Sequence, residues 1–203
     1  MSGFARSVRE ARPVRPSELT LLEGHEAFSV GGFTVLDFWR WALGDLRMNN
    51  TRGYLAEFLV ARAVGARSSQ RVEWGAHDVL APDGTRIEVK SSAYLQSWAQ
   101  RAPSIPRFSL TGAKSVWDPA VGAYVEDPTG RVDIWVFALH TCTEHARYDP
   151  LDVGQWCFWT LPARTVETCG QKTGAVSKIR RLAGEPCPWE GLSEAVARAA
   201  RRL

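Results

Sequence analysis

The sequence predicts an α/β fold in a single domain, with a central mixed β-sheet flanked by helices, and three observations indicate it. The chain has 203 residues, 45% hydrophobic and 23% charged, which suits one globular domain with a sizeable core. Helical patterns come first, followed by strand patterns and then by mixed elements. Residues 132–139 (VDIWVFAL) are almost continuously apolar, as expected for a central strand covered on both faces.

A basic N-terminal arm is expected at residues 1–20, ahead of a domain that spans residues 21–203. Prolines at positions 13 and 16 interrupt any helix there. Arginine recurs at every third position, as Arg6, Arg9, Arg12 and Arg15. Such a segment is either an arm that touches phosphates or a solvated tail, and the sequence leaves both interpretations open.

Three helices are predicted, the last of them at residues 191–202. The first spans residues 34–47, with Thr34 as its N-cap. Its apolar face contains Val35, Phe38, Trp39, Ala42 and Leu46. The second spans residues 51–64, between an N-cap at Thr51 and a C′ glycine at Gly65. Its apolar stripe contains Tyr54, Leu55, Phe58, Leu59 and Ala63.

β-Structure is predicted for residues 71–92, and further strands for 108–110, 132–139 and 156–161. A hairpin signal lies within the first of these segments, because a Pro-Asp-Gly loop separates two apolar runs. If this loop has three residues, Ala81 opposes Thr85, and counting back along both strands places Asp78 opposite Glu88. Side chains alternate along a strand, so Glu88 and Lys90 share one face while Ile87 and Val89 face the core.

Two opposed carboxylates with Cβ atoms roughly 5 Å apart repel each other unless a positive charge lies between them. Lys90 is one candidate for that charge. A divalent cation is a better one, because hard cations take oxygen ligands from one or two carboxylates together with water and phosphate. The hairpin therefore predicts a metal-binding site at Asp78 and Glu88.

Asp78, nine intervening residues and the triplet Glu88-Val89-Lys90 resemble the motif of the PD-(D/E)XK nuclease superfamily, which includes many restriction endonucleases. An acidic residue on a preceding helix often completes the site in that family, and Glu57 is the counterpart here. Some members carry a glutamine after the lysine strand, for which Gln96 is the nearest match. One departure is His77, which stands where the family often has proline.

This resemblance implies a restriction-endonuclease-like fold and a DNA endonuclease that depends on Mg²⁺ or Mn²⁺. Asp78 and Glu88, with the Val89 carbonyl, would hold the metal, and Lys90 would orient the nucleophile or stabilise developing charge. Glu57 would bind a second metal or anchor the water, with Gln96 as a further catalytic candidate. Many enzymes of this fold act as homodimers.

The main interpretation is an endonuclease that is restriction-like or has a role in DNA repair or defence. Two alternatives remain open. Arg52-Gly53 followed by Glu57 resembles the helix of Holliday-junction resolvases, which implies a structure-selective nuclease. The chain is alternatively a non-catalytic nucleic-acid-binding or protein-binding module on the same fold, because a fold does not guarantee its usual activity. The sequence also leaves open whether the substrate is duplex, branched or modified DNA, or RNA.

Basic residues near the predicted strands are candidates for phosphate contacts, although each also suits a solvated face. They are Arg52, Lys114, Lys172, Lys178, Arg180 and Arg181. The formal net charge of +3 neither requires nor excludes a nucleic-acid partner. Residues 104–130 are either an insertion or a recognition loop.

The remaining motifs are weak. His140, Cys142 and His145 lie close together, and Cys157 is a fourth metal-ligand candidate, but the spacing matches no zinc motif, and reduced thiols are the alternative. No run of 18 apolar residues predicts a membrane span, and the N-terminus has no apolar stretch typical of a secretory signal. We therefore expect a cytoplasmic protein without a membrane partner.

Overall fold

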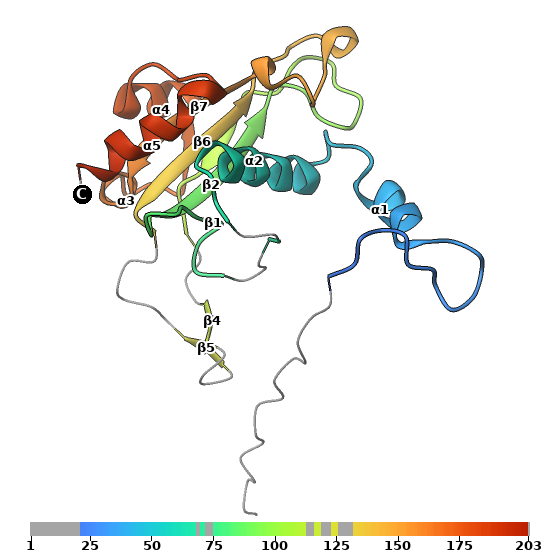
Figure 1. The fold of residues 1–203 in the computed structure, drawn as a ribbon. Coiled ribbons are helices and arrows are strands. Elements are labelled where there is room, and N and C mark those ends of the chain that lie inside the picture. Colours follow the sequence, from blue (N-terminus) through green and yellow to red (C-terminus); the bar gives the residue numbers. More distant parts are fainter. Residues whose placement is uncertain are drawn as a thin grey trace, which may run out of the picture.

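A mixed sheet of four strands forms the centre of the fold, in the order β1-β2-β6-β7 (Figure 1). Its strands are β1 (Val79–Leu80), β2 (Arg86–Ala93), β6 (Ile134–His140) and β7 (Trp156–Pro162). The hairpin strands β1 and β2 are antiparallel, β2 and β6 are parallel, and β6 and β7 are antiparallel. Every residue of β6 is buried, as the apolar run at this position predicts. The predicted α/β class and mixed sheet are confirmed.

The computed structural model describes residues 21–67, 70–71, 75–112, 116–118, 123–125 and 132–202. Two of the sequence predictions, the basic arm at residues 1–20 and the phosphate contact at Lys114, lie outside these ranges. Among the described residues, no helix combines the length and the apolar character needed to cross a bilayer.

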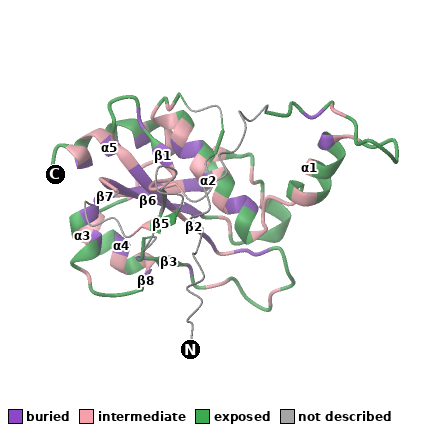
Figure 2. Cartoon of the chain, turned by 90° about the horizontal axis from the view of Figure 1, so that it is seen from below, coloured by how far each residue is buried: buried purple, intermediate pink, exposed green. Residues whose placement is uncertain are grey.

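Helices cover both faces of the sheet and give the molecule three layers (Figures 1 and 2). On one face, α2 (Asn49–Ala63) packs against β2 and α5 (Leu192–Ala200) packs against β6 and β7, and their apolar residues share one cluster with Ile87 and Val89 of β2. On the other face, α3 (Ala163–Glu167) and α4 (Val176–Ala183) pack against Phe137 of β6 and its neighbours. The alternation of side chains in β6 and β7 therefore supplies apolar residues to two separate cores, one on each face of the sheet.

The remaining elements lie around this centre. They are α1 (Val35–Leu43), β3 (Arg107–Ser109), β4 (Val116–Asp118), β5 (Ala123–Val125), β8 (Thr173–Ala175) and the 3-10 helices η1 (His145–Arg147), η2 (Val153–Gln155) and η3 (Trp189–Gly191). β3 pairs with β8, whereas β4 and β5 pair only with each other and stand apart from the central sheet in Figure 1. The segment 104–130 thus contributes one strand to a small second sheet and a separate hairpin.

Helix α1 has the predicted start but lacks the predicted packing. Thr34 caps it and forms a reciprocal capping box with Asp37. The helix ends at Leu43, with Gly44 as its C-cap, rather than at the predicted residue 47. Within it only Val35 is buried, and Phe38, which was expected on the buried face, is exposed. Local signals suffice to start this helix, but the body of the fold does not cover its apolar face.

Helix α2 differs from the prediction in its first turn and in its buried stripe. It begins at Asn49, so Thr51 lies inside the helix, where its hydroxyl donates to the carbonyl oxygens of Asp45 and Met48. Gly65 follows the helix with φ of +69°, as predicted for a C′ residue. The buried residues of the helix are Thr51, Arg52, Ala56, Leu59 and Val60. Because α2 has apolar residues on two sides, sequence alone chose the wrong side for Tyr54 and Phe58, which are exposed.

Candidate active site

The hairpin that carries the predicted motif has the expected register. Ala81 N–H donates to Thr85 O at 2.9 Å, and Gly84 N–H donates to Ala81 O at 2.9 Å with Gly84 at φ of +89°. The pairs Val79↔Ile87 and Leu80↔Arg86 follow from this turn. The paired register ends at Val79, so the pairing of Asp78 with Glu88 that the loop length predicts is not part of the ladder, and Asp78 follows directly at its end.

Asp78 lies at the end of the β1–β2 ladder and is fixed there by two hydrogen bonds to β2. Its N–H donates to Ile87 O at 3.0 Å. Its carboxylate Oδ2 accepts a hydrogen bond from the Val89 N–H at 2.8 Å. In a longer β1, a backbone carbonyl would accept the hydrogen bond from the Val89 N–H. Here the Asp78 carboxylate accepts it instead. The Asp78 carboxylate is therefore held against the backbone between Glu88 and Lys90.

Glu88 and Lys90 lie on the same face of β2 and form an ion pair. Lys90 Nζ donates to Glu88 Oε1 at 2.5 Å, and it lies 5.5 Å from the ring centroid of Trp135 on the neighbouring strand. The Glu88 side chain is 11% exposed. Burial and the nearby Asp78 charge raise the pKa of Glu88, and the Lys90 ammonium opposes both effects. The ion pair therefore neutralises this carboxylate only in part.

Glu57 approaches the same group from helix α2. Its carboxylate accepts from Arg71, with Nε and Oε2 at 2.6 Å. Burial raises the pKa of Glu57, the hydrogen bond from Arg71 lowers it, and the charge on Asp78 raises it again. The charge on Lys90 also lowers the pKa of Glu57, as the smallest of these effects. Asp78 therefore raises the pKa of both glutamates, Lys90 opposes it at both, and Arg71 opposes it at Glu57.

The oxygen atoms of this site suit a hard divalent cation, although the predicted ligand set is not fully assembled. The Asp78 carboxylate is bonded to the N–H of Val89, which follows Glu88 in β2, and its charge acts on the Glu88 carboxylate. Glu57 directs its carboxylate to Arg71. Within the part of the chain that the structure describes, no group of three or more His, Cys, Asp or Glu side chains is placed to hold a metal ion. A metal here would take its protein ligands from Asp78 and Glu88, with the Val89 carbonyl.

Gln96 and Arg52 form a buried polar pair with each other. Arg52 is 2% exposed, and its Nη1 donates to Gln96 Oε1 at 3.1 Å and to Arg47 O at 3.0 Å, while Nη2 donates to Asn49 Oδ1 at 2.8 Å. Gln96 Nε2 donates to Ala93 O at 3.0 Å. This is a correction for Arg52, because a phosphate contact needs an exposed guanidinium. The Gln96 amide is likewise engaged in joining α2 to the segment after β2.

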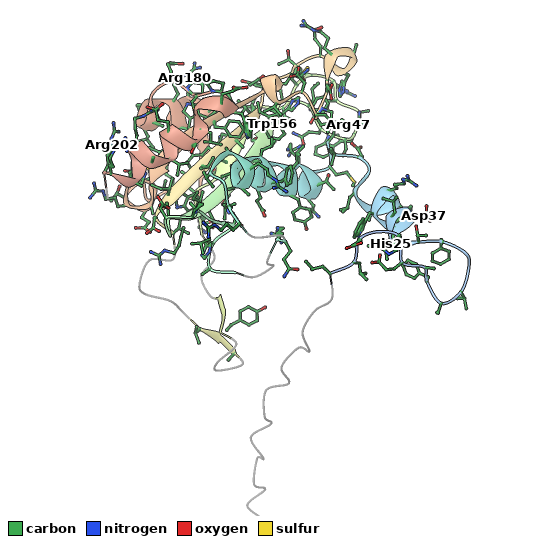
Figure 3. All side chains as sticks on the ribbon, viewed as in Figure 1. His25, Asp37, Arg47, Trp156, Arg180 and Arg202 are labelled. Atoms are coloured by element: carbon green, nitrogen blue, oxygen red, sulfur yellow. The ribbon has the colours of Figure 1, made fainter. Side chains whose placement is uncertain are left out.

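The other basic candidates lie on α4 and the loop before it. Lys172, Arg180 and Arg181 are exposed, and Lys178 is half-buried and donates to Gln171 at 2.7 Å. Arg180 also pairs with Glu185 at 3.3 Å. Figure 3 shows Arg180 and Arg202 on the side of the fold away from His25 and Asp37. These cations remain accessible to phosphate, but they belong to other elements than Asp78 and Glu88, which lie on the β1–β2 hairpin.

The alternative zinc ligands do not converge. His140 is fully buried on β6, stacks on Tyr148 with ring centroids 4.1 Å apart, and places Nε2 3.3 Å from Asp149 O. Cys142 Sγ donates to Glu144 O instead. Burial raises the pKa of Cys157 to about 11, so that thiol is not prepared to act as a thiolate ligand. His140 is a core residue here.

Sequence reasoning missed a hollow beside the motif and the arginine in it. The hollow measures about 560 Å³ and lies between α2 and the segment that leads into β1. Its lining includes Tyr54, Glu57, Phe58, Arg62, Arg71 and Asp78. No sequence motif relates Arg71 to Glu57. Their contact depends on the course of the chain between α2 and β1. Tyr54 and Phe58 were predicted to lie in the buried stripe of the helix, so their place in this lining was not anticipated either.

Comparison of the chain with models of known protein families, with curated proteins and with solved structures returns no significant match.

Proposed function

We propose that this protein is a metal-dependent DNA endonuclease of the PD-(D/E)XK type, with a restriction-endonuclease-like core. The observation that carries this proposal is the Lys90–Glu88 ion pair with the Asp78 carboxylate beside it, bonded to the N–H of the intervening Val89. A partly buried carboxylate with a raised pKa, placed beside a second carboxylate and a lysine, is typical of catalytic centres, and Glu88 meets this description. On a solvated sheet face, the Glu88 carboxylate would be exposed and burial would not raise its pKa.

The path of the chain supports the proposal. Helix α2 precedes the hairpin and brings Glu57 to it, which is the place that the resemblance assigns to an additional acidic residue. The β6 strand then pairs parallel to β2 and anchors the motif strand in the centre of the sheet. Because β2 is bonded on both sides, its side chains are held rigidly, as catalytic groups require.

Asp78 and Glu88 would hold Mg²⁺ or Mn²⁺ together with the Val89 carbonyl. Bound there, the metal would polarise a phosphate oxygen and lower the pKa of a coordinated water. Asp78 is prepared for this role because the Val89 N–H fixes one of its oxygens. Glu88 is prepared because its burial keeps competing water away.

Lys90 and Glu57 have complementary roles in the proposed reaction. The Lys90 ammonium, oriented by Glu88, would donate a hydrogen bond to the phosphate and stabilise the negative charge that develops on it. Glu57 has a raised pKa and would accept a hydrogen bond from the attacking water. Arg71 fixes the direction of the Glu57 carboxylate through its hydrogen bond.

A cleavage assay tests the proposal. Purified protein is incubated with supercoiled plasmid, linear duplex, single strands and a four-way junction, with Mg²⁺, Mn²⁺ or EDTA. We expect cutting that depends on the metal, and a rate lower by about a thousandfold in Glu88→Gln and in Lys90→Ala, because both remove groups that act on the transition state. The preferred substrate distinguishes a restriction-like enzyme from a junction-selective one.

Glu194→Gln is the matched control for these variants. Glu194 is an exposed carboxylate on α5 that pairs with Arg198 at 2.8 Å, so the variant removes a comparable ion pair away from the site. Its cutting rate should equal that of the wild type. Cleavage at the wild-type rate by Glu88→Gln would contradict the nuclease proposal.

A non-catalytic nucleic-acid-binding module on the same fold is the second candidate. One observation favours it: Arg71 engages Glu57, and no group of three metal-ligating side chains forms among the described residues. Calorimetric titration with Mn²⁺ separates the candidates. A nuclease should bind the metal and lose binding in Asp78→Asn, whereas the module should show no binding that depends on Asp78.

A further inference from the structure

The hollow beside Asp78 has a composition that the proposed cleavage chemistry does not explain. Two aromatic rings from successive turns of α2 line it, Tyr54 at 41% and Phe58 at 51% exposure. Ala61, Ala66, Val79 and Leu80 add further apolar surface. Single exposed aromatics are ordinary, but two neighbouring rings lining one hollow of about 560 Å³ form a shaped apolar surface.

Each ring also carries a guanidinium on its face. The Arg71 guanidinium lies 4.7 Å from the Tyr54 ring centroid, and the Arg62 guanidinium lies 4.9 Å from the Phe58 centroid. Arg71 is held in place by Glu57, whereas Arg62 is exposed. The hollow therefore combines flat apolar faces with positive charge at its rim.

The hollow is continuous with the candidate active site, because Glu57 and Asp78 belong to both. If a phosphate of a nucleic-acid strand lies at Asp78 and Glu88, the nucleotide next to that phosphate would lie at the mouth of this hollow. A ligand that fits must present a flat apolar face and a negative charge next to it. A nucleotide has both, since bases stack on aromatic rings and phosphates pair with arginine.

We propose that the hollow binds an unpaired nucleobase that neighbours the scissile phosphate, with Tyr54 and Phe58 as stacking surfaces and Arg62 as a phosphate contact. This inference rests on the proposed function for the position of the phosphate. A base inside a regular duplex is stacked on its neighbours and enters such a pocket only after it is extruded, which costs free energy. The substrate class is therefore nucleic acid with at least one unpaired base, such as a single strand or a flap, rather than uninterrupted duplex.

Binding measurements test the inference independently of cleavage. The full chain carrying Glu88→Gln is titrated, with Mg²⁺ present, into fluorescently labelled oligonucleotides as a single strand, a perfect duplex and a duplex with an unpaired flap. We expect the single strand and the flap to bind about tenfold more tightly than the duplex. Adding Phe58→Leu should weaken binding of the unpaired substrates about tenfold and leave duplex binding unchanged, because leucine keeps apolar volume but offers no ring for stacking.

Trp41→Leu is the matched control, since Trp41 is an aromatic residue on α1 that is 84% exposed and does not line the hollow. It should keep the preference for unpaired bases. Tyr54→Leu provides a second variant if Phe58→Leu does not fold. Equal binding of duplex and single strand, or a preference that persists in both Tyr54→Leu and Phe58→Leu, would overturn the inference.

The two proposals fail in different ways. A wild-type protein that never cuts but prefers unpaired bases through Phe58 would contradict the nuclease and support the hollow. A wild-type protein that cuts perfect duplex and single strands equally well, with Phe58→Leu unchanged, would support the nuclease and contradict the hollow.

Discussion

Two cations of strand β2 pair with carboxylates at similar distances, but the pKa values of the two carboxylates shift in opposite directions. At its start, Arg86 pairs with Asp133 at 2.8 Å, and hydrogen bonds from Arg86 lower the pKa of Asp133. Two residues further along, Lys90 pairs with Glu88 at 2.5 Å, but burial and Asp78 raise the pKa of Glu88. Distance alone therefore does not distinguish a structural ion pair from a candidate catalytic one.

The difference lies in what surrounds each pair. Asp133 accepts three hydrogen bonds from Arg86, from its backbone N–H, Nε and Nη2. Glu88 accepts one hydrogen bond from Lys90 and lies near a second carboxylate, that of Asp78, whose charge raises the pKa of Glu88. A carboxylate that is satisfied stabilises the fold, whereas one that is buried among like charges remains ready to bind a cation.

Metal binding should produce the largest difference in stability between variants at the candidate site and variants at the Arg86–Asp133 pair. At a Mg²⁺ or Mn²⁺ concentration 100 times the dissociation constant, the free energy of unfolding should rise by about 2.7 kcal/mol. Thermal unfolding with and without metal measures it. The increase should vanish in Asp78→Asn and persist in Asp133→Asn, and an equal increase in both variants would place the metal elsewhere.

Neutralising the two carboxylates one at a time should give opposite effects on stability. Asp133→Asn should lower the free energy of unfolding by about 1–2 kcal/mol, because it removes charged hydrogen bonds that are only partly exposed. Glu88→Gln should leave it unchanged or raise it, because the fold favours the neutral form of that side chain.

Urea unfolding of both variants beside the wild type measures these changes. A loss in Glu88→Gln as large as that in Asp133→Asn would mean that the Glu88–Lys90 pair is structural.

The pH dependence of stability should show the same contrast with a smaller amplitude. Glu57 and Glu88 have folded pKa values above their ordinary value of 4.5, so between the two values the folded state binds more protons. Stability then falls as the pH rises through that window. Asp133 has a folded pKa below 3.8, so its contribution is present above that value and is lost as the pH falls through the folded pKa.

The double variant Glu57→Gln with Glu88→Gln isolates the first of these effects. Its free energy of unfolding should decrease less than that of the wild type as the pH rises above 4.5. Chemical unfolding at a series of pH values provides the comparison, and identical slopes for the two proteins would contradict the raised pKa values.

Most of the candidate site was predictable because its core lies within one hairpin. The loop length determined the register, and side-chain alternation put Glu88 and Lys90 on one face. Gln96 and Arg52 were predicted as site residues and are instead bonded to each other, since nothing local shows that a side chain from α2 reaches the segment after β2. Arg71 was missed for the same reason.

The helices likewise separate features that the local sequence determines from features that depend on tertiary packing. The capping box of Thr34 and Asp37 and the positive φ of Gly65 followed from local sequence. The buried side of α2 did not, because Tyr54 and Phe58 have the same hydrophobic character as the residues that the sheet covers. Hydrophobicity predicts that a helix has an apolar side, but only the position of the sheet selects which one is buried.

The sequence by itself determined the hairpin, its two carboxylates, the central strand β6 and the mixed α/β class, because each depends on turn geometry, alternation or a run of apolar residues. Only the tertiary structure decided that β2 runs parallel to β6, that Glu57 and Arg71 join the site, and that the rings of α2 line a hollow beside it. These features bring together residues distant in the chain, and their contacts depend on how whole elements pack rather than on any local pattern.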